Sequence, residues 1–350
     1  MTDKRTLNPK FTYTARLVKM LTKIAVSRES ILSSPLVPKW EVGLCFDAMV
    51  RSAHSSTSIE GNRLSLEQVS QLARGREVTA TRKDKQEVLN YLKVLKDIDK
   101  LAKKGIAEET ILEIHRTLTE GVMENSLDSG AYRTRYVVVG NRITGEVYFR
   151  PPKNKDVPGL VRALVDWLNS EEAKELDPVL AAGIAHYEFV RIHPFIDGNG
   201  RTARALATLV LYLRGFDVKK FFALDDYYDS DRQAYYKVLQ SIDQKTLDIT
   251  NWLEYFTEGV SVSLEAVKER VLRLSSERIR AAKNGQIALT ERQMQIVEFI
   301  NQNGKITNRD VMGMFKFSSN KSAFTEIMKL VDMKVLKSEG KGRSKHYVLA

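Results

Sequence analysis

Residues 193–204 read His-Pro-Phe-Ile-Asp-Gly-Asn-Gly-Arg-Thr-Ala-Arg, which brings an imidazole, a carboxylate, two glycines and two arginines close together in the chain. The turn Gly198-Asn199-Gly200 is too flexible for a helix interior, and a strongly helical run follows it. The turn is therefore expected to open a helix, whose free N–H groups and positive dipole end favour a bound anion. Arg201 and Arg204 are three residues apart, so both can project from the first turn on about the same side. These features predict a phosphate-binding site.

Two further side chains of this segment fit phosphate chemistry. The carboxylate of Asp197 suits the Mg²⁺ ion of a nucleotide, because such an ion usually takes one or two carboxylates together with phosphate oxygens. His193, in its neutral form, could remove the proton of an attacking hydroxyl group. A lone histidine at a helix end is usually structural, and a lone Gly-Asn-Gly is usually only a turn. The combination favours a catalytic site, since each position serves one kind of chemistry.

The segment resembles the motif HPFx(D/E)GNGRxxR of the Fic family at every fixed position, and the resemblance extends over about residues 110–260. It implies transfer of AMP from ATP to a Ser, Thr or Tyr hydroxyl of a target protein, which could be the chain itself, with release of pyrophosphate. The resemblance makes His193 the base and Asp197 the Mg²⁺ ligand. The backbone of Gly198 to Gly200 and the Asn199 side chain would cradle the phosphates. Arg201 would support the β-phosphate, and Arg204 would bind the γ-phosphate.

A second motif lies far upstream, where Ser56, Glu60 and Gly61 match the Fic inhibitory pattern (S/T)xxxE(G/N). Gly61 is a natural helix stop, which places Glu60 at the negative end of a helix dipole and makes a cationic partner favourable. Taken alone, such a glutamate is usually a solvated surface residue. The resemblance implies that Glu60 pairs with Arg204 and holds the enzyme inactive, as in the class whose inhibitory helix precedes the Fic motif.

Residues 136–149 have two β-rich arms around a turn and predict a hairpin, which is followed by Pro151 and Pro152. An ordinary surface hairpin is one interpretation. In the Fic family the equivalent hairpin is a flap that aligns the target by strand addition, which implies a docking role for the backbone of Val147, Tyr148 and Phe149. The resemblance also favours Tyr235, rather than its neighbour Tyr236, as a contact of the nucleotide.

The composition indicates a helical protein of several domains. The chain has 350 residues, one cysteine and a formal net charge of +11. Its N-terminus lacks the apolar core of a signal peptide and no run could span a bilayer, so we expect a cytoplasmic protein. Cys45 lies in an apolar helical stretch and is expected to belong to the core. Apolar periodicity predicts helices over Phe11–Ser27, Val42–Glu60, Asp84–Lys104, Glu108–Thr119, Asp156–Asn169, Pro178–Ile192, Asp229–Ile242 and Thr250–Ala282.

We expect a mainly α fold made of an N-terminal helical region at residues 1–105 with the inhibitory motif, a Fic catalytic core with a β-hairpin flap at 106–283, and a winged-helix domain at 284–350. The last prediction rests on three helices followed by a hairpin. Residues 290–350 contain eleven Lys or Arg against six Asp or Glu, so DNA is a candidate partner. Lys321, Lys329, Lys341, Arg343 and Lys345 would then contact it.

The sequence leaves several functions open. The first is protein adenylylation with ATP and Mg²⁺. The second is another Fic reaction, either transfer of a different phosphate-containing group or removal of AMP. The third is a DNA-binding regulator whose Fic core senses a nucleotide. A homodimer is also open, while the target protein and the signal that releases Glu60 are not specified by the sequence.

Overall fold

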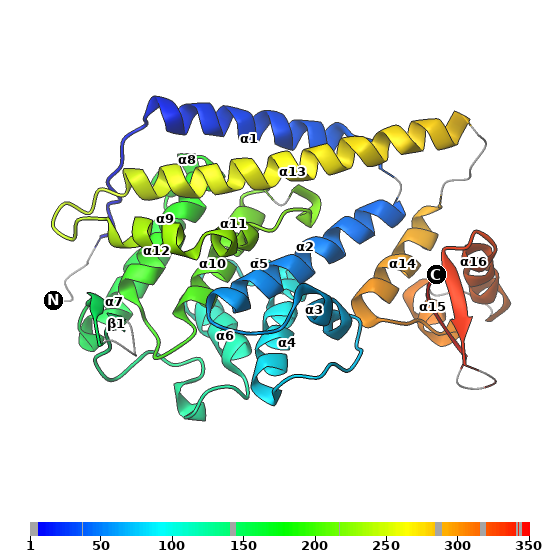
Figure 1. Cartoon of the computed structure of the whole chain (residues 1–350), viewed down its shortest axis with the longest axis horizontal. Coiled ribbons are helices and arrows are strands. Elements are labelled where there is room, and N and C mark those ends of the chain that lie inside the picture. The colour runs from blue at the N-terminus through cyan, green and yellow to red at the C-terminus, as the bar shows by residue number, and fades with distance from the viewer. Residues whose placement is uncertain are drawn as a thin grey trace.

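The computed structural model describes residues 6–36, 38–140, 145–216, 218–283, 289–315, 320–340, 342 and 345–350. The described residues form a mainly helical fold with two small antiparallel hairpins, which confirms the predicted mainly α class (Figure 1). No helix of the described residues is both long enough and apolar enough to cross a membrane.

The first five helices, α1 to α5, make up the N-terminal part of the fold. Long α1 packs along α13, and α2 runs beneath them toward the middle of the molecule (Figure 1). Buried side chains of α1 and α2, such as Leu17 and Leu44, share a hydrophobic cluster with residues beyond 105, so the N-terminal region is packed into the same core. The bounds of these helices are α1 Ala15–Ser33, α2 Pro38–Ile59, α3 Leu66–Ala73, α4 Arg82–Lys96 and α5 Ile98–Lys104.

The centre of the fold is the pair α9 and α10, which pack on each other and carry the ends of the 193–204 motif. Apolar residues on all sides of α9 are buried, as expected for a helix in the middle of a bundle. The elements of this part are α6 Glu108–Thr119, η1 Ser126–Asp128, η2 Asn154–Asp156, α7 Val157–Leu168, α8 Glu171–Glu175, α9 Pro178–Ile192, α10 Asn199–Leu213, η3 Val218–Lys220, α11 Asp225–Ser230, α12 Arg232–Gln240 and α13 Thr250–Lys283.

Four predicted helices differ from the structure, and one of them, predicted over Val42–Glu60, only begins earlier, at Pro38. The other three differ more. The first begins at Ala15, because the Thr14 side chain caps it by accepting from Leu17 N–H, and it continues to Ser33. The single helix predicted over Asp84–Lys104 is broken at Asp97, and the break lets α5 place Ile98 and Leu101 in the buried cluster of α4. The helix predicted over Asp229–Ile242 is divided into α11 and α12 at Asp231, whose extended backbone and capping side chain start α12.

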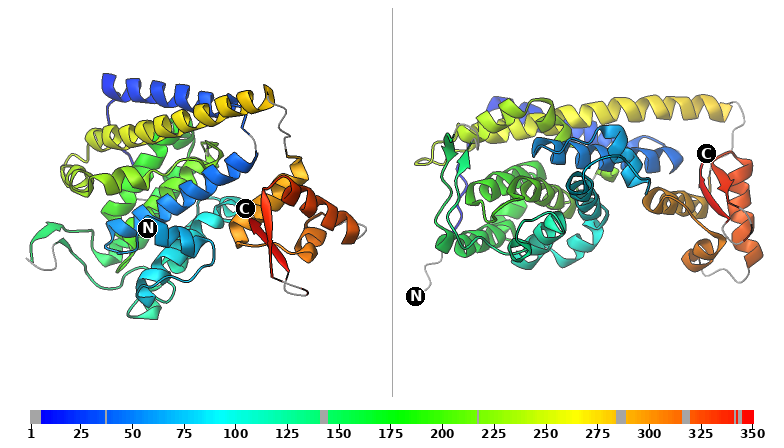
Figure 2. Two further views of the ribbon diagram at one scale, coloured as in Figure 1. Left: turned by 45° about the vertical axis from the view of Figure 1, so that its right-hand side comes forward. Right: turned by 60° about the horizontal axis from the view of Figure 1, so that its bottom comes forward.

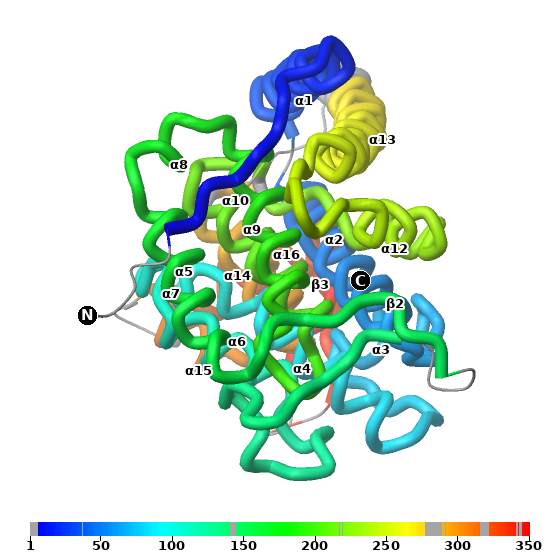
Figure 3. The backbone as a smooth tube through the Cα atoms, turned by 90° about the vertical axis from the view of Figure 1, so that its left-hand side faces the viewer, coloured from blue at the N-terminus to red at the C-terminus, as the bar shows by residue number. Residues whose placement is uncertain are grey.

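The predicted hairpin consists of β1, Val139–Gly140, and β2, Val147–Phe149, which pair antiparallel with Val139 opposite Phe149. Residues 141–144 between the strands lie outside the described residues. Figure 3 views the molecule from the side on which the hairpin lies, at the end opposite the C-terminal helices. Val147 is 39% exposed and Tyr148 is 42% exposed, so β2 presents side chains to solvent.

The C-terminal residues form a small body with its own hydrophobic cluster at one end of the molecule (Figure 2). Three helices precede a hairpin in which Leu336 pairs with Leu349, and α14 packs against α2. The order of elements is that of the predicted winged helix, whose domain assignment and DNA binding stay predictions. The bounds are α14 Glu291–Asn303, α15 Asn308–Phe315, α16 Asn320–Asp332, β3 Leu336–Glu339 and β4 His346–Leu349.

The basic residues predicted to contact DNA are only partly described. Lys329 pairs with Glu326 on the same helix at 2.8 Å, and the Lys345 ammonium lies over the Tyr347 ring. The side chain of Lys321, together with Lys341 and Arg343, lies outside the described residues, as does the predicted domain boundary at residue 284.

Candidate active site

The loop between α9 and α10 holds His193 in an uncommon conformation. His193 ends α9 with a left-handed backbone, φ 51°, and Pro194 prevents the helix from continuing. Arg133 is a buried residue between η1 and β1. It donates from Nε to the His193 carbonyl at 2.8 Å and from its backbone N–H to the Pro194 carbonyl at 2.9 Å. These two bonds fix the turn and therefore the direction of the imidazole.

The His193 side chain is prepared to accept a proton. Its Nδ1 lies 3.3 Å from the Val190 carbonyl, which favours the tautomer with the proton on Nδ1 and leaves Nε2 as the acceptor. The pKa of His193 is lowered to about 4, mainly by burial and in part by the Arg133 charge, while the Val190 carbonyl and the carboxylates of Glu60 and Asp197 oppose this shift. The imidazole is consequently neutral at pH 7, the state that a general base needs.

The first turn of α10 is an anion site built on glycine. Gly198 caps the helix with φ +77°, and a Cβ there would lie 3.1 Å from Thr119 Cγ2 and 3.3 Å from His115 Nε2. A side chain at Gly200 would come within 2.3 Å of Glu60 Oε1, so the carboxylate of Glu60 lies directly against this turn. The free N–H groups and positive dipole end of α10 favour a negative charge at that point.

Arg204 joins the two distant motifs. Its guanidinium donates from Nη2 to Glu60 Oε1 at 2.8 Å and to the Ser56 carbonyl at 2.8 Å, and from Nε to Ser56 Oγ at 2.7 Å. The Arg204 side chain is 2% exposed, whereas that of Glu60 is 29% exposed. Glu60 follows the last residue of α2, and Gly61 takes φ +95°, as the sequence predicts for a helix stop. Glu60 thus occupies the arginine and the helix start that a nucleotide phosphate would need.

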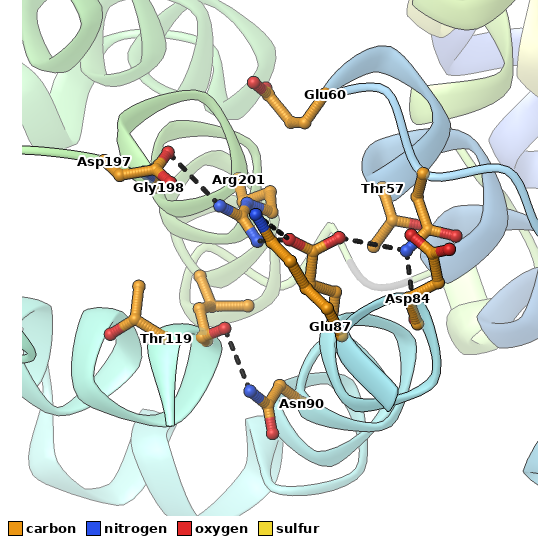
Figure 4. A network of polar contacts seen from close by, with 12 residues as sticks. Thr57, Glu60, Asp84, Glu87, Asn90, Thr119, Asp197, Gly198 and Arg201 are labelled. Atoms are coloured by element: carbon orange, nitrogen blue, oxygen red, sulfur yellow. Dashed lines mark hydrogen bonds and ion pairs between the residues drawn. The ribbon is translucent and has the colours of Figure 1, made fainter. Parts of the chain in front are cut away.

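Arg201 lies between two carboxylates, as Figure 4 shows. Its Nη2 is 3.4 Å from Asp197 Oδ1, and its Nη1 is 3.6 Å from Glu87 Oε1 of α4. The guanidinium is buried, yet among the described residues its Nε and Nη1 donate no hydrogen bond. A buried guanidinium with unused donors favours an added anion, which agrees with the phosphate contact predicted for Arg201.

Asp197 fits a nucleotide-borne Mg²⁺ better than a metal held by protein alone. Its side chain is 60% exposed, and Oδ1 accepts from Gly198 N–H at 2.5 Å, which fixes the carboxylate on the rim of the phosphate loop. The part of the chain that the structure describes contains no group of three His, Cys, Asp or Glu side chains able to hold a metal. One exposed carboxylate is what a Mg²⁺ ion needs when phosphates and water supply its other ligands.

Comparison with known proteins identifies the fold that carries this site. Residues 105–211 match the model of the Fic/DOC family. This part of the chain, which contains the whole 193–204 motif, is similar to the Fic/DOC family. The chain is 31% identical over 219 residues to the protein adenylyltransferase Fic of Drosophila willistoni, a match that covers 59% of this chain and 42% of that protein.

Two solved structures resemble the chain. A Fic family protein from Desulfovibrio desulfuricans G20 superposes with a TM-score of 0.64 at 22% identity, over 98% of both chains, which supports the fold alone. A Fic domain containing signaling protein from Bacteroides thetaiotaomicron gives a TM-score of 0.53 at 27% identity, over 78% of this chain and 100% of that one. The chain spans only 42–50% of the length of the first curated relatives that it matches.

Two of the residues assigned to nucleotide binding have partners within the protein. The Asn199 side chain accepts from Phe195 N–H and donates to the Phe195 carbonyl, both at 2.9 Å, so it shapes the loop, and its phosphate contact stays a prediction. Tyr235 is 1% exposed and its hydroxyl lies 3.1 Å from His186 Nε2. Its neighbour Tyr236 is 40% exposed. The nucleotide contact of Tyr235 stays a prediction.

The structure also adds residues that no motif of the sequence indicates. His115 stacks on Phe195 with ring centroids 3.6 Å apart, accepts from Gly130 N–H at Nδ1, and bonds the Asp197 carbonyl through Nε2 at 2.9 Å. His115 therefore supports the loop between α9 and α10 through Phe195 and Asp197. Asp225, buried at the start of α11, lies 3.4 Å from Arg204 Nε and gives that arginine a second counter-ion.

Asn62 ties the end of the Glu60 segment to α4. Its amide donates to the Asp84 carbonyl at 2.9 Å and to Glu87 Oε2 at 3.0 Å, and its Oδ1 accepts from Leu64 N–H. Glu87 is the same carboxylate that faces Arg201. Each motif arginine therefore pairs with a glutamate of the N-terminal region, Arg204 with Glu60 and Arg201 with Glu87. Asn62 follows Glu60 by two residues and bonds to Glu87, so it connects the two ion pairs.

Proposed function

We propose that this protein is an autoinhibited protein adenylyltransferase that uses ATP and Mg²⁺. The observation that carries the proposal is the bond from Arg204 to Glu60 at the glycine-rich start of α10, beside a neutral His193. A carboxylate placed on an anion site takes a position that a phosphate would hold once Glu60 is withdrawn. Relatives about 30% identical carry the name protein adenylyltransferase.

The chemistry follows from the roles of the residues. His193 Nε2 accepts the proton of the target hydroxyl, the hydroxyl oxygen forms a bond to the α-phosphorus, and the bond from that phosphorus to the bridging oxygen of pyrophosphate breaks. Arg201 and Arg204 stabilise the negative charge that builds on the leaving pyrophosphate. Asp197 would hold a Mg²⁺ ion that neutralises phosphate charge. The exposed β2 strand would align the target segment by adding a strand.

Autoinhibition follows from competition for one guanidinium. While Glu60 and Ser56 occupy Arg204, the γ-phosphate of ATP has no arginine to bind, and the α-phosphate is not fixed for attack. Withdrawal of Glu60 leaves Arg204 with Asp225 as its remaining carboxylate partner, so its buried charge stays compensated. The Nη2 hydrogen that Glu60 accepts then becomes available to a phosphate.

The proposal is tested with radiolabelled ATP. Glu60→Gly protein is incubated with Mg²⁺ and with ATP labelled at either the α- or the γ-phosphate, with a cell lysate as the source of acceptor proteins. Kinases of the lysate transfer the γ-phosphate whether or not His193 is present, so the test compares the label that depends on His193. We expect this label to come from the α-phosphate only, and to be lost in Glu60→Gly/His193→Ala. A His193-dependent label from the γ-phosphate, or an α-phosphate label that survives the loss of His193, would contradict the proposal.

A further inference from the structure

The guanidinium of Arg201 lies between two carboxylates that come from different parts of the fold (Figure 4). The Arg201 side chain is 3% exposed, its Nη2 lies 3.4 Å from Asp197 Oδ1, and its Nη1 lies 3.6 Å from Glu87 Oε1. Both distances exceed the length of a strong hydrogen bond between charged groups, which is about 2.7–2.9 Å. The guanidinium is therefore shared between Asp197 and Glu87 and is not committed to either of them.

The two carboxylates differ in what else they can bind. The Asp197 side chain is 60% exposed on the rim of the phosphate loop, whereas that of Glu87 is 11% exposed. A Mg²⁺ ion on a nucleotide keeps several water ligands and takes one or two carboxylates, so it needs a carboxylate that reaches solvent. Of these two residues, Asp197 meets that requirement, and Glu87 serves Arg201 as a buried counter-charge.

The position of the Glu87 carboxylate is fixed by a neighbour other than Arg201. Asn62 donates to Glu87 Oε2 at 3.0 Å, which leaves the second oxygen, Oε1, facing Arg201. The Lys83 ammonium also lies 4.0 Å from Oε1, but that lysine side chain is 65% exposed, and a pair of this kind contributes little. The negative charge of Glu87 is consequently directed at the motif arginine.

Loss of the charge on Glu87 would change the partner of Arg201. A buried guanidinium that loses one counter-charge is strongly destabilised, so it pairs more closely with a carboxylate that remains. Within the described part of the chain that carboxylate is Asp197, which lies four residues before Arg201 and already faces it. A closer pair would draw the Asp197 carboxylate toward the guanidinium, and the arginine and the Mg²⁺ ion would then compete for one negative charge.

We propose that Glu87 is a positioning residue that neutralises Arg201 and thereby leaves Asp197 free to bind the Mg²⁺ ion of ATP. This inference rests on the proposed function, because the ion enters with the nucleotide. Loss of a residue that orients a metal ligand typically lowers metal affinity about 10-fold to 100-fold. Glu87 acts through Arg201 and over 3.6 Å, so we expect the lower end of that range.

The role of Glu87 is tested without turnover by calorimetric titration of ATP into Glu60→Gly/His193→Ala, once with excess Mg²⁺ and once with EDTA. Added to this background, Glu87→Gln should reduce the preference for Mg²⁺-bound over metal-free ATP about tenfold. Metal-free ATP should bind at least as tightly as before, since Arg201 keeps its positive charge. An unchanged preference would overturn the proposal. An equal loss of both affinities, as expected if Glu87 only supports the fold, would overturn it as well.

Two control variants separate the charge of Glu87 from its other contacts. Lys83→Gln removes the exposed partner of the same carboxylate and should leave the preference for Mg²⁺-bound ATP unchanged. Glu87→Asp keeps the negative charge on a shorter side chain and should retain most of the preference. A loss in Lys83→Gln, or a loss in Glu87→Asp as large as that in Glu87→Gln, would contradict the assigned role.

The rate of AMP transfer gives a second measurement. In the Glu60→Gly background and at a fixed ATP concentration, Glu87→Gln should need about tenfold more Mg²⁺ for its half-maximal rate and should recover the maximal rate at saturating Mg²⁺. An unchanged Mg²⁺ requirement would contradict the proposal. If Glu60→Gly transfers no AMP at any Mg²⁺ concentration, the proposed function fails, while the titration still decides the role of Glu87.

Discussion

The contact between Glu60 and Arg204 predicts how far each change at Glu60 should activate the protein. Glu60→Gln keeps an oxygen that can accept from Arg204 Nη2 but loses the negative charge, whereas Glu60→Gly loses the whole contact. A hydrogen bond to a charged group contributes about 1.5–3 kcal/mol and a neutral one about 0.5–1.5 kcal/mol. Because the Glu60 side chain is 29% exposed, the lower part of the charged range applies.

These magnitudes convert into expected rates. If the plugged form dominates in the wild-type protein, loss of about 1.5 kcal/mol raises the open fraction by about tenfold, and loss of charge alone raises it by about threefold to fivefold. The rates of AMP transfer should therefore rise in the order wild type, Glu60→Gln, Glu60→Gly. Initial rates with α-labelled ATP at saturating Mg²⁺ measure this order.

A matched control is available on α3. Glu67 is an exposed glutamate that bonds to Gln71 rather than to Arg204, so Glu67→Gln should leave the rate unchanged. The reasoning is refuted if Glu60→Gln is as slow as the wild-type protein while Glu60→Gly is fast, or if Glu67→Gln activates to the same extent.

Three further predictions concern the surroundings of the site. Since the pKa of His193 is about 4, the rate of AMP transfer by Glu60→Gly should change little between pH 7.5 and pH 5.5. A base with the ordinary histidine pKa would lose about 90% of its neutral form over the same range. A tenfold loss in initial rate would contradict the assigned pKa. Asn62→Ala should give a transfer rate between those of the wild type and Glu60→Gly, because it frees the end of α2 from α4. Asn90→Ala also removes two bonds of α4, to the backbone carbonyls of Leu118 and Glu120, but it should not activate. Equal rates in the two alanine variants would count against the anchor. Burial lowers the pKa of His115 to about 4, so as the pH drops from about 6.5 the unfolded protein takes up a proton before the folded protein does, and the free energy of unfolding falls. In urea unfolding, His115→Gln should lose about 2 kcal/mol less of this free energy than the wild type between pH 7.5 and pH 5. Identical losses in the two proteins would exclude this role.

The sequence predicts the parts of the site whose chemistry is local. The glycines, the arginines and His193 lie within one short segment, so their spacing alone indicates a helix start that binds phosphate. Gly61 likewise marks the end of α2 and places Glu60 there. The pairing of Glu60 with Arg204 across the chain came from the resemblance to the Fic inhibitory motif, because local patterns do not specify which distant residues meet.

The remaining parts depend on tertiary packing. Asp225 follows Leu224 in an acidic, aromatic segment, and nothing in that pattern indicates that it is buried beside Arg204. His115 is one of several polar residues on α6, and its support of the loop depends on Phe195 lying against its ring. Adjacent tyrosines point about 100° apart on a helix, so the sequence could not decide which of Tyr235 and Tyr236 is buried.

The central claim is that Glu60 occupies the γ-phosphate position on Arg204. Calorimetric titration of ATP and ADP into His193→Ala and Glu60→Gly/His193→Ala tests it without turnover or an acceptor. Removal of Glu60 should increase the affinity for ATP about tenfold more than the affinity for ADP, since only ATP brings a γ-phosphate to Arg204. Equal gains for the two nucleotides, or no gain for either, would contradict the claim.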